Sequence, residues 1–574
     1  MTDVGEESRV ELQWGVRIPL RDGIHLHATV YAPADRRTPM PVIYIPTPYV
    51  SDTHHGRGMY FAGRGWPVAI VDVRGRGNSG GEFRPFLQEA QDGYDTVEWI
   101  ARQPYCNGKV AMLGGSYIGY CQWATAKELP PHLATIVPAA SPYESVDSPM
   151  RNNIRQPYQM QWLMMTAGKT SQNTIFSDGA FWSSRFREWH NSGRPLCELD
   201  VMLGTPSAIF QEWLSHPEPD AYWDQYNPTA EEYARLEIPI LTITGSYDDD
   251  QPGALEHYKQ HMRYGTSRAR AQHYLIIGPW DHLRTGWMNR ADFGGLKLEP
   301  SSLIDMPKLH REWYAWTLQG AVKPEFLKKQ VAFYVIGAEQ WRYAESLEAI
   351  TAGYEELLLD SSTNADDVFS SGSLGFSPAT GNPDTYRYDP RDAQGPGSEA
   401  EARLDSGSFV DQSVMLALRG KALFYHSAPF ERDLEVSGFF ELVAWISIDC
   451  PDTDLYASVH EITSGGDCIR LATDAIRARY RESLRTPKLV DTDRPLRYSF
   501  TRFTFISKLI RRGHRLRLVI APIGRLIDAA FTERNFNGGG LVAEESVLDS
   551  RPVTVKLFHD REHPSALRVP VGHF

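Results

Sequence analysis

The chain has 574 residues, of which 42% are hydrophobic and 11% aromatic, and its formal charge is −13. A chain of this length exceeds what one hydrophobic core can hold, so we expect two or three domains. The acidic balance disfavours nucleic acid as a partner, since phosphate binding needs a basic surface.

The amino-terminal stretch, MTDVGEESRVELQW, is polar and acidic and has neither the basic nor the apolar part of a secretory signal. The chain holds no run of about 18 apolar residues, so we expect no membrane span and no membrane partner. Its five cysteines are scattered and odd in number, which favours free thiols in a reducing cytoplasm. No spacing typical of a metal site occurs, and we expect no cofactor; a homo-oligomer stays open.

Residues 1–145 alternate between strand and helix patterns. The segments MPVIYIPTPY and WPVAIVDVRG are short apolar runs of the kind buried on both faces of a sheet, and KVAMLGG and LATIVPAAS supply two more. Between them, EAQDGYDTVEWIARQ places apolar side chains along one helical stripe. This alternation predicts an α/β fold with a doubly wound sheet.

Helical patterns replace the strands between residues 146 and 235. The segments RQPYQMQWLMMTAGK, GAFWSSRFREWH and SAIFQEWLSHPE are rich in Met, Trp and Phe at mostly helical spacing. Strands resume in residues 236–354 with IPILTITGSYD and AQHYLIIGPWDH, and the helix MPKLHREWYAWTLQG follows. We therefore predict a helical insertion in a sheet that continues on its far side.

The composition and the pattern of predicted elements change again in residues 355–574. Residues 363–386 are rich in Gly, Ser, Asn, Asp and Pro and are predicted to form a linker. Beyond them come short strands such as LEVSGFFELVAWISI, DLYASVHEI and HRLRLVIAP, with turns at the spacing of a β-sandwich. We predict an all-β domain of jelly-roll type up to the carboxyl terminus.

A serine stands where a buried strand meets a helix, in the segment GGSYIGY. Ser116 follows two glycines, and small neighbours are typical of a nucleophile elbow, in which a strained turn presents a serine hydroxyl. The usual pattern is GxSxG, whereas here Ile118 occupies the +2 position and Gly119 the +3 position. On this segment alone, a tight turn without catalysis is equally open.

Two further polar residues end later strands in the order that a Ser-acid-His triad requires. Asp248 follows IPILTITGSY, and His282 follows HYLIIGPWD. Because ligands bind outside the carboxyl ends of such strands, we expect Ser116, Asp248 and His282 to meet there. The alternative for His282 is a solvated loop histidine, and for the neighbouring Asp249 and Asp250 a solvated acidic turn.

Nucleophilic catalysis by a serine needs each of these groups. A serine hydroxyl is a poor nucleophile at neutral pH, so His282 would take its proton and pass it to the leaving group, while Asp248 holds the imidazole. The oxyanion would need the N–H of Tyr117, at the start of a helix, and a second donor after the third strand. In IPTPYVSD that donor is Tyr49, for which plain packing is the alternative.

These motifs together resemble those of the family that contains bacterial cocaine esterases, α-amino-acid ester hydrolases and Xaa-Pro dipeptidyl-peptidases. The resemblance covers nearly the whole chain. Its parts are PY after the third strand, DVRGRGNSGGEF (72–83), GGSYIG, GSYD, GPWDH, ARYRESLRTP (478–487), RRGHRLRLVIAP (511–522) and RNFNGG (534–539).

The resemblance implies an α/β-hydrolase fold with a helical cap and a C-terminal jelly roll. The catalytic domain would then comprise residues 1–145 and 236–354, the cap residues 146–235, and the jelly roll residues 355–574. These are the same divisions that the strand and helix patterns suggest.

The resemblance also implies the roles of the site residues. Ser116 would be the nucleophile, Asp248 and His282 its triad partners, and the Tyr49 hydroxyl with the Tyr117 N–H the oxyanion hole. Such an enzyme hydrolyses a small-molecule carboxylic ester through an acyl-enzyme. Amide hydrolysis and acyl transfer share that intermediate and remain the alternative.

The sequence says less about which acyl group the substrate carries. The α-amino-acid ester hydrolases hold their substrate's ammonium in a carboxylate cluster, part of which follows the triad acid. Asp250 occupies a comparable place here, but Gln251 comes next, so only part of the cluster is present. Trp162 and Trp182 of the aromatic cap are further candidates for substrate binding. A hypothesis of another class is a vestigial hydrolase whose jelly roll binds a ligand such as a sugar.

Overall fold

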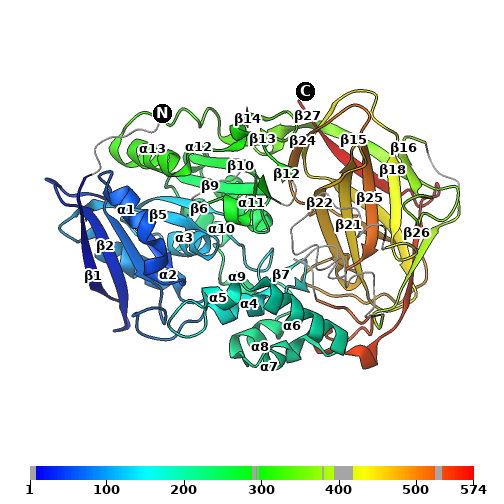
Figure 1. The fold of residues 1–574 in the computed structure, drawn as a ribbon, viewed down its shortest axis with the longest axis horizontal. Coiled ribbons are helices and arrows are strands. Elements are labelled where there is room, and N and C mark those ends of the chain that lie inside the picture. The colour runs from blue at the N-terminus through cyan, green and yellow to red at the C-terminus, as the bar shows by residue number, and fades with distance from the viewer. Residues whose placement is uncertain are drawn as a thin grey trace.

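A long, mostly parallel sheet forms the first part of the molecule, as the computed structural model shows (Figure 1). The structure describes residues 8–286, 292–293, 296–377, 381–392, 416, 418–523 and 533–573. Within them, the sheet has ten strands in the order β1-β2-β4-β3-β5-β6-β9-β10-β13-β14. The strands are β1 (Val10–Pro19), β2 (His25–Pro33), β3 (Met40–Thr47), β4 (Val68–Asp72), β5 (Cys106–Gly115), β6 (Leu133–Ala139), β9 (Ile240–Tyr247), β10 (His273–Asp281), β13 (Val331–Val335) and β14 (Gln340–Ala344).

The strands from β4 to β13 along this order are parallel, and β1, β2 and β14 are antiparallel to their neighbours. This is the sheet of an α/β hydrolase, so the predicted doubly wound α/β fold is confirmed. Its crossover helices are α1 (His55–Ala62), α2 (Glu89–Ala101), α3 (Tyr117–Lys127), α11 (Gln251–Tyr264), α12 (Ser267–Ala271) and α13 (Met306–Gln319).

Both faces of the sheet are covered, which explains the unbroken apolar runs of its strands. Ile43 and Ile45 of β3 pack in one core with Phe61 of α1 and residues of α13. Val42 and Tyr44, which alternate with them, pack in a second core with residues of α2 and α3. The carboxyl ends of β3, β5, β9 and β10 therefore converge on one edge of a rigid sheet.

The helices predicted between residues 146 and 235 are present, and those from α4 to α9 are here called the cap. They lie below the sheet in the view of Figure 1. One detail differs from the prediction, because a short antiparallel strand pair precedes the helices. The elements are β7 (Met150–Arg151), β8 (Ile154–Arg155), α4 (Tyr158–Met165), α5 (Asn173–Phe176), α6 (Gly179–Ser192), α7 (Leu199–Met202), α8 (Ala208–Leu214), α9 (Ala221–Asp224) and, returning to the sheet, α10 (Ala230–Arg235).

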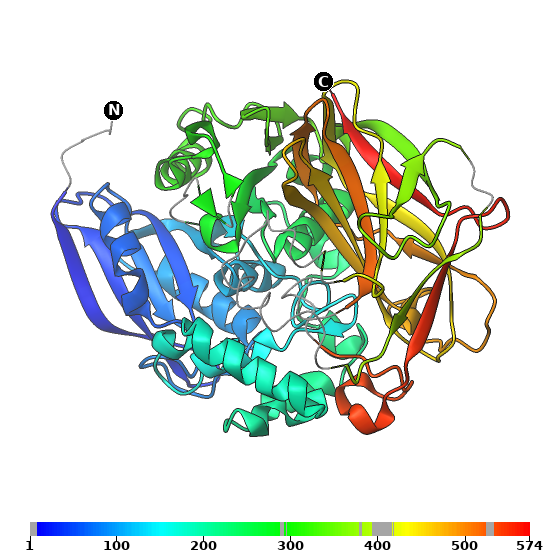
Figure 2. The ribbon, with the colours of Figure 1, turned by 45° about the vertical axis from the view of Figure 1, so that its right-hand side comes forward.

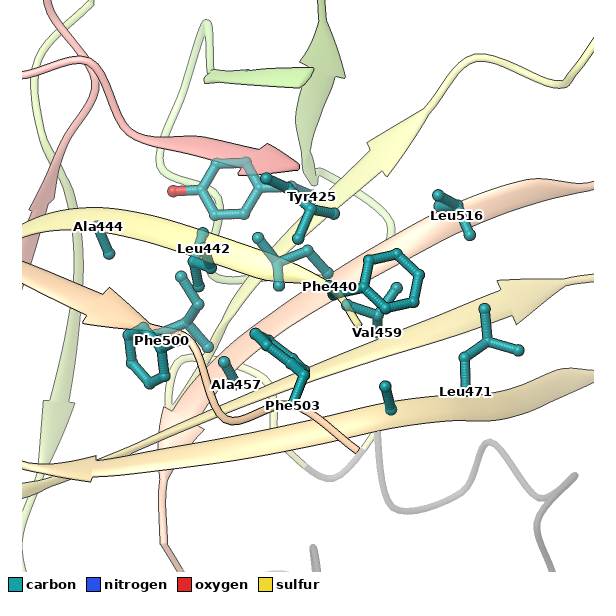
Figure 3. Packing of buried hydrophobic residues seen from close by; sticks show 14 of the residues in the cluster. Tyr425, Phe440, Leu442, Ala444, Ala457, Val459, Leu471, Phe500, Phe503 and Leu516 are labelled. Atoms are coloured by element: carbon teal, nitrogen blue, oxygen red, sulfur yellow. The ribbon is translucent and has the colours of Figure 1, made fainter. Parts of the chain in front are cut away.

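The last part of the chain is all-β, as predicted. Thirteen strands among the described residues form one curved sheet system around an aliphatic and aromatic core that includes Phe440, Phe500 and Phe503 (Figure 3). The strands are β15 (Thr351–Asp360), β16 (Gly372–Gly375), β17 (Asp384–Tyr388), β18 (Leu423–Ser427), β19 (Leu434–Gly438), β20 (Glu441–Ile448), β21 (Asp454–Ile462), β22 (Cys468–Arg477), β23 (Leu496–Phe500), β24 (Ile506–Ile510), β25 (Arg515–Pro522), β26 (Val553–Phe558) and β27 (Ala566–Gly572).

The prediction of a linker at residues 363–386 was wrong. β16 and β17 lie in this segment and pair with β15, β18 and β26, and only residues 378–380 fall outside the described part. Polar turn residues dominate the composition there because these strands are short. Pairing with β15, β18 and β26 overrides their weak strand propensity.

The β domain packs against both the sheet and the cap, which Figure 2 shows from a second side. Gln251 at the start of α11 exchanges hydrogen bonds with the backbone of Phe505, at 3.0 and 2.6 Å. On the cap side, the Val547 N–H donates to the Gly193 carbonyl at 2.8 Å. Among the described residues, no helix has the length and apolar character that a membrane span requires.

Candidate active site

Ser116 occupies the sharp turn between β5 and α3. Its backbone has φ 60° and ψ −134°, a conformation that only glycine adopts without strain. The turn is held because the Ser116 N–H donates to the carbonyl oxygens of Ala139 and Ala140, at 2.9 and 3.0 Å. The hydroxyl is thus presented, partly exposed, at the carboxyl edge of the sheet.

Two glycines explain how the chain can turn so tightly here. Gly114 has φ 149°, and a Cβ on it would collide with the side chain of Ile118. A Cβ on Gly119 would lie 2.9 Å from the Ala139 carbonyl oxygen and 3.0 Å from Cβ of Ser141. The close approach of α3 to the end of β6 therefore requires the glycine at the +3 position.

Asp248 and His282 meet at the ends of β9 and β10. Asp248 Oδ1 lies 2.9 Å from His282 Nδ1, and its other oxygen accepts a hydrogen bond from Thr244 Oγ1 at 2.8 Å. The Asp248 side chain is fully buried, whereas the imidazole is about a quarter exposed. A carboxylate on Nδ1 fixes that nitrogen as the donor, so Nε2 is left as the proton acceptor.

Asp250 faces the same histidine. Its Oδ2 lies 3.6 Å from His282 Nδ1, and its side chain is one fifth exposed. Burial lowers the pKa of His282, but the charges of Asp250 and Asp248 outweigh it, so the pKa lies above its usual 6.5. Burial raises the pKa of Asp250, and the nearby His282 opposes that shift.

Asp281, directly before the histidine, serves the local backbone. Its carboxylate accepts a hydrogen bond from the Arg284 N–H at 3.1 Å and pairs with the Arg284 guanidinium. It is the N-cap of the short 3₁₀ turn that carries His282. The acidic residue at this place therefore fixes the turn on which the imidazole stands.

Tyr49 follows β3, and its hydroxyl is directed to the serine. Its N–H donates to Thr47 Oγ1 at 3.0 Å, which sets the first residues of the loop. The hydroxyl accepts a hydrogen bond from the indole N–H of Trp162 at 3.3 Å and also interacts with Ser116. Burial raises the pKa of Tyr49 to about 12, although both hydrogen bonds act in the opposite direction. The group is therefore a neutral hydrogen-bond donor throughout the neutral range.

Tyr117 begins α3, where an N–H has no acceptor within the helix. Its ring is locked by two hydrogen bonds, one donated to the Glu89 carboxylate and one accepted from the Phe86 N–H at 3.0 Å. The ring also packs on Phe86 and on Trp162, with centroid distances of 4.9 and 5.3 Å. The N–H at the helix start is thereby held in place beside Ser116.

A buried arginine joins the loop of Tyr49 to the cap. Arg76 donates from Nε to the Pro48 carbonyl at 2.7 Å and from Nη1 to the Thr166 carbonyl at 2.5 Å. It also contacts the carbonyls of Gly168 and Thr170. Its side chain is fully buried, so these backbone carbonyls replace the water that a guanidinium would otherwise bind.

The two tryptophans predicted to bind substrate, Trp162 and Trp182, lie in the cap helices α4 and α6, and Gln251 begins α11. Trp182 is buried in the cap, where its indole N–H donates to the Ile175 carbonyl at 2.7 Å and its ring packs on Phe186. Gln251 is buried, and its side-chain Nε2 donates to the carbonyl oxygens of Gly245 and Phe505. It therefore holds the loop after β9 to the β domain. Trp162 stands beside Tyr49.

The structure adds Arg76, Glu89 and Phe86 to the residues that the sequence suggested. Glu89 reads as an ordinary acidic residue at a helix start, and no pattern distinguishes it. Arg76 lies within DVRGRGNSGG, where an arginine among glycines after a buried strand was the available signal. In the described part of the chain, no group of three or more His, Cys, Asp or Glu side chains could hold a metal ion.

Two family models match this chain. Residues 22–284 match the X-Pro dipeptidyl-peptidase (S15 family) model. Residues 324–522 match the X-Pro dipeptidyl-peptidase C-terminal non-catalytic domain. The first match ends just after His282, and the second begins before the last two strands of the α/β sheet, β13 and β14, and continues through most of the all-β part.

Individual relatives match over the whole length. A cocaine esterase from Rhodococcus sp. (strain MB1 Bresler) is 26% identical, over 97% of this chain and 98% of its own. The crystal structure of an α-amino acid ester hydrolase superposes with a TM-score of 0.81 at 20% identity, covering 98% of this chain and 97% of that one. An aminopeptidase from a marine sediment Thaumarchaeota archaeon gives 0.82 at 20% identity, covering 100% and 97%. The two structures share the fold of this chain.

Proposed function

The chain belongs to the family that joins an S15-type serine hydrolase domain to an X-Pro dipeptidyl-peptidase C-terminal domain, and we propose that it cleaves carboxylic esters through an acyl-enzyme on Ser116. The observation that carries this proposal is the hydrogen bond of 2.9 Å between Asp248 and His282, at the edge of the sheet where the strained Ser116 stands. The Tyr49 hydroxyl next to Ser116 supports it.

The proposed reaction has two halves. Ser116 Oγ attacks the ester carbonyl carbon while its proton passes to His282 Nε2, and the carbonyl oxygen becomes an oxyanion. Tyr49 O–H and Tyr117 N–H donate to that oxyanion. Collapse breaks the bond to the alcohol, which leaves with the proton from His282. A water molecule, deprotonated by His282, then attacks the acyl-enzyme, and the carboxylic acid leaves with Ser116 restored.

Amide hydrolysis is the second candidate, since the solved structures that share this fold include an aminopeptidase. Both reactions form the same acyl-enzyme, so the same residues would serve. We rank ester cleavage first because an alcohol leaves more easily than an amine, and because the full-length relative with the highest identity quoted above is an esterase.

The test is a hydrolysis screen in which aryl esters, α-amino esters and amides with the same acyl group are compared, with Ser116→Ala as control. We expect the esters to be cleaved fastest and Ser116→Ala to lose on the order of 10⁶ in kcat. Activity of Ser116→Ala within tenfold of the parent would contradict the proposal. Faster cleavage of the amides than of the esters would make amide hydrolysis the first candidate.

Asp250 bears on the preference for an amine. Its carboxylate lies 3.6 Å from His282 Nδ1, and the next residue, Gln251, donates its amide N–H to a backbone carbonyl, so position 251 adds no second carboxylate to that of Asp250. We expect methyl phenylacetate to be cleaved at least comparably to phenylglycine methyl ester. A preference for the amino ester above about a hundredfold in kcat/KM, near 2.7 kcal/mol, would reverse that ranking.

We also propose that the enzyme acts in the cytoplasm. Support comes from its five cysteines, which are all free thiols and mostly buried. A reducing compartment keeps such thiols unpaired. Cell fractionation with an antibody against the protein would test this location, and recovery from the culture medium would contradict it.

A further inference from the structure

We propose that Trp162 of the cap is a positioning residue that aims the Tyr49 O–H proton at the oxyanion. This inference rests on the proposed function, because it assumes that Tyr49 serves the oxyanion. It goes further in assigning part of the oxyanion hole to the cap, which lies outside the α/β sheet. Trp162 was predicted above as a substrate-binding residue, and the contacts point to a different role.

The donors and acceptors of the two side chains determine the direction of their hydrogen bond. An indole N–H can only donate, whereas a phenol hydroxyl donates one proton and accepts at its oxygen. The hydrogen bond of 3.3 Å between Trp162 Nε1 and the Tyr49 oxygen must therefore run from Trp162 to Tyr49. The accepting side of Tyr49 is thus occupied, and its own proton is left for the oxygen atoms around Ser116.

The indole is itself held rigidly and away from solvent. Trp162 is only 7% exposed. Its ring stacks on Tyr117, with a centroid distance of 5.3 Å and an interplanar angle of 29°, and on Phe86, at 6.1 Å and 20°. A ring buried in this way can influence the reaction chiefly through the atoms that it touches. Among the residues that it touches are the two that supply the proposed oxyanion donors, Tyr49 and Tyr117.

Arg76 fixes the backbone around Tyr49 relative to the backbone around Trp162. Arg76 bonds to the Pro48 carbonyl, directly before Tyr49, and to the Thr166 carbonyl, directly after α4. Thr166 in turn donates through its N–H to the Trp162 carbonyl at 3.0 Å. One buried guanidinium therefore spans from the Tyr49 loop to the helix end that carries Trp162. A weak side-chain hydrogen bond between distant segments is useful only if both backbones are fixed, and here they are.

The hydrogen bond from Trp162 also improves Tyr49 as a donor through its effect on the pKa of the hydroxyl. Burial raises the pKa of Tyr49 to about 12, which would weaken it as a donor, and the hydrogen bond from Trp162 opposes this shift. Electron density drawn toward the indole proton makes the Tyr49 O–H more acidic. Its hydrogen bond to an oxyanion is stronger as a result.

The test is a double-mutant cycle with Tyr49→Phe and Trp162→Phe, measured as kcat and KM on one aryl ester. Tyr49→Phe alone should lower kcat by roughly 10²–10³, the usual effect of one oxyanion donor. Trp162→Phe alone should lower kcat by about tenfold, the size of a 1.4 kcal/mol interaction, and change KM by less than about threefold. In the Tyr49→Phe background, Trp162→Phe should cause no further loss.

A matched control and an isosteric variant separate positioning from packing. Trp189 is also a buried cap tryptophan whose indole N–H donates to a backbone carbonyl, that of Pro195, at 3.3 Å. Trp189→Phe should leave kcat unchanged in both backgrounds. Replacement of Trp162 by 3-benzothienylalanine removes the N–H but keeps the bicyclic ring, so it should reproduce the kcat loss of Trp162→Phe even if the smaller phenylalanine loosens the cap.

The outcomes distinguish this inference from the proposed function. An unchanged kcat in Tyr49→Phe would overturn the role of Tyr49 and this inference with it, while the assignment of Ser116 would stand. Equal losses from Trp162→Phe with and without the Tyr49 hydroxyl would overturn the inference alone. Full activity of the benzothienyl variant would do the same, because the ring and not its N–H would then matter.

Discussion

At the scale of single residues, the unusual feature is that two carboxylates face one nitrogen of His282. Asp248 lies 2.9 Å from Nδ1 and Asp250 3.6 Å from it, and Asp249 is close enough to add to the same effect. A triad needs only one acid to orient the ring. The second carboxylate stabilises the imidazolium further, which favours proton uptake from Ser116 but requires a higher pH to restore the free base.

This arrangement predicts the pH dependence of the enzyme. In the proposed mechanism neutral His282 is the base, and its pKa is raised, so the acidic limb of kcat/KM should lie above pH 6.5. Asp250→Asn removes the largest effect that raises this pKa, so the limb should move to lower pH. The measurement is a pH–rate profile of both proteins on a substrate that does not titrate.

Asp249→Asn is the matched control, since Asp249 is exposed and raises the pKa of His282 less than Asp250 does. It should shift the limb less. A limb that stays in place in Asp250→Asn, or that moves to higher pH, would show that Asp250 does not act on His282.

At the scale of elements, the contact between α3 and β6 determines where Ser116, the proposed nucleophile, stands. Gly119 lets the helix approach the Ala139 carbonyl, and the Ser116 N–H bonds to the same carbonyl. The first turn of α3 and the end of β6 are therefore one unit. A change in their spacing would move Ser116 and the Tyr117 N–H together.

Gly119→Ala tests this coupling. The added Cβ would lie 2.9 Å from a backbone oxygen that cannot move aside, so the helix must shift. We expect a loss of roughly 1–3 kcal/mol in the free energy of unfolding and a fall in kcat. Denaturant unfolding and kinetics on one ester would measure both.

Gly56 in α1 provides the comparison, because a Cβ there meets nothing within 4 Å. Gly56→Ala should be neutral or stabilising, by up to about 1 kcal/mol, as expected for a helical glycine without neighbours. If Gly119→Ala behaves like Gly56→Ala, the close approach of α3 to β6 is not a constraint.

The elements that carry the site could be predicted because buried parallel strands have a clear signature. The apolar runs that end at Gly115, Tyr247 and Asp281 mark three strand ends, and polar residues at such ends converge on one edge. The contacts of Trp162 with Tyr49 and of Arg76 with Thr166 could not be found in this way. They join residues 113 and 90 positions apart, and depend on how the cap rests on the sheet.

At the scale of the whole molecule, a buried polar network fastens the cap to the β domain. Arg477 of β22 pairs with Asp454 at 2.8 Å and with Glu533 at 2.9 Å, and donates to the Asn153 carbonyl next to β8. Glu533 also accepts the Arg155 N–H at 2.8 Å. The strand pair β7–β8, which precedes the cap helices, is thus held to the β domain by buried charges. These contacts fix the position of the cap relative to the β domain.

Arg477→Met should therefore be strongly destabilising. Removal of the guanidinium leaves two buried carboxylates without their partner, which typically costs about 3–5 kcal/mol. Thermal or urea unfolding would measure the loss, and kinetics on the folded variant would show whether the site at Tyr49 and Trp162 suffers as well.

Arg485→Met is the control at the same interface. Arg485 also joins the β domain to the cap, through Asp224 at 2.6 Å, but both side chains are more than half exposed. An exposed pair is worth about 0–1 kcal/mol. Equal losses in the free energy of unfolding of the two variants would contradict the view that burial makes the Arg477 network strongly stabilising.

The most direct test of the account is covalent labelling of the nucleophile. A fluorophosphonate loses fluoride to the serine oxygen of an active triad and leaves a stable phosphonyl ester. We predict one label per chain, on the peptide that contains Ser116, and none on that peptide in Ser116→Ala. Unchanged labelling of Ser116→Ala at another serine, or rapid ester hydrolysis by a parent protein that takes up no label, would contradict the assignment of Ser116 as the nucleophile.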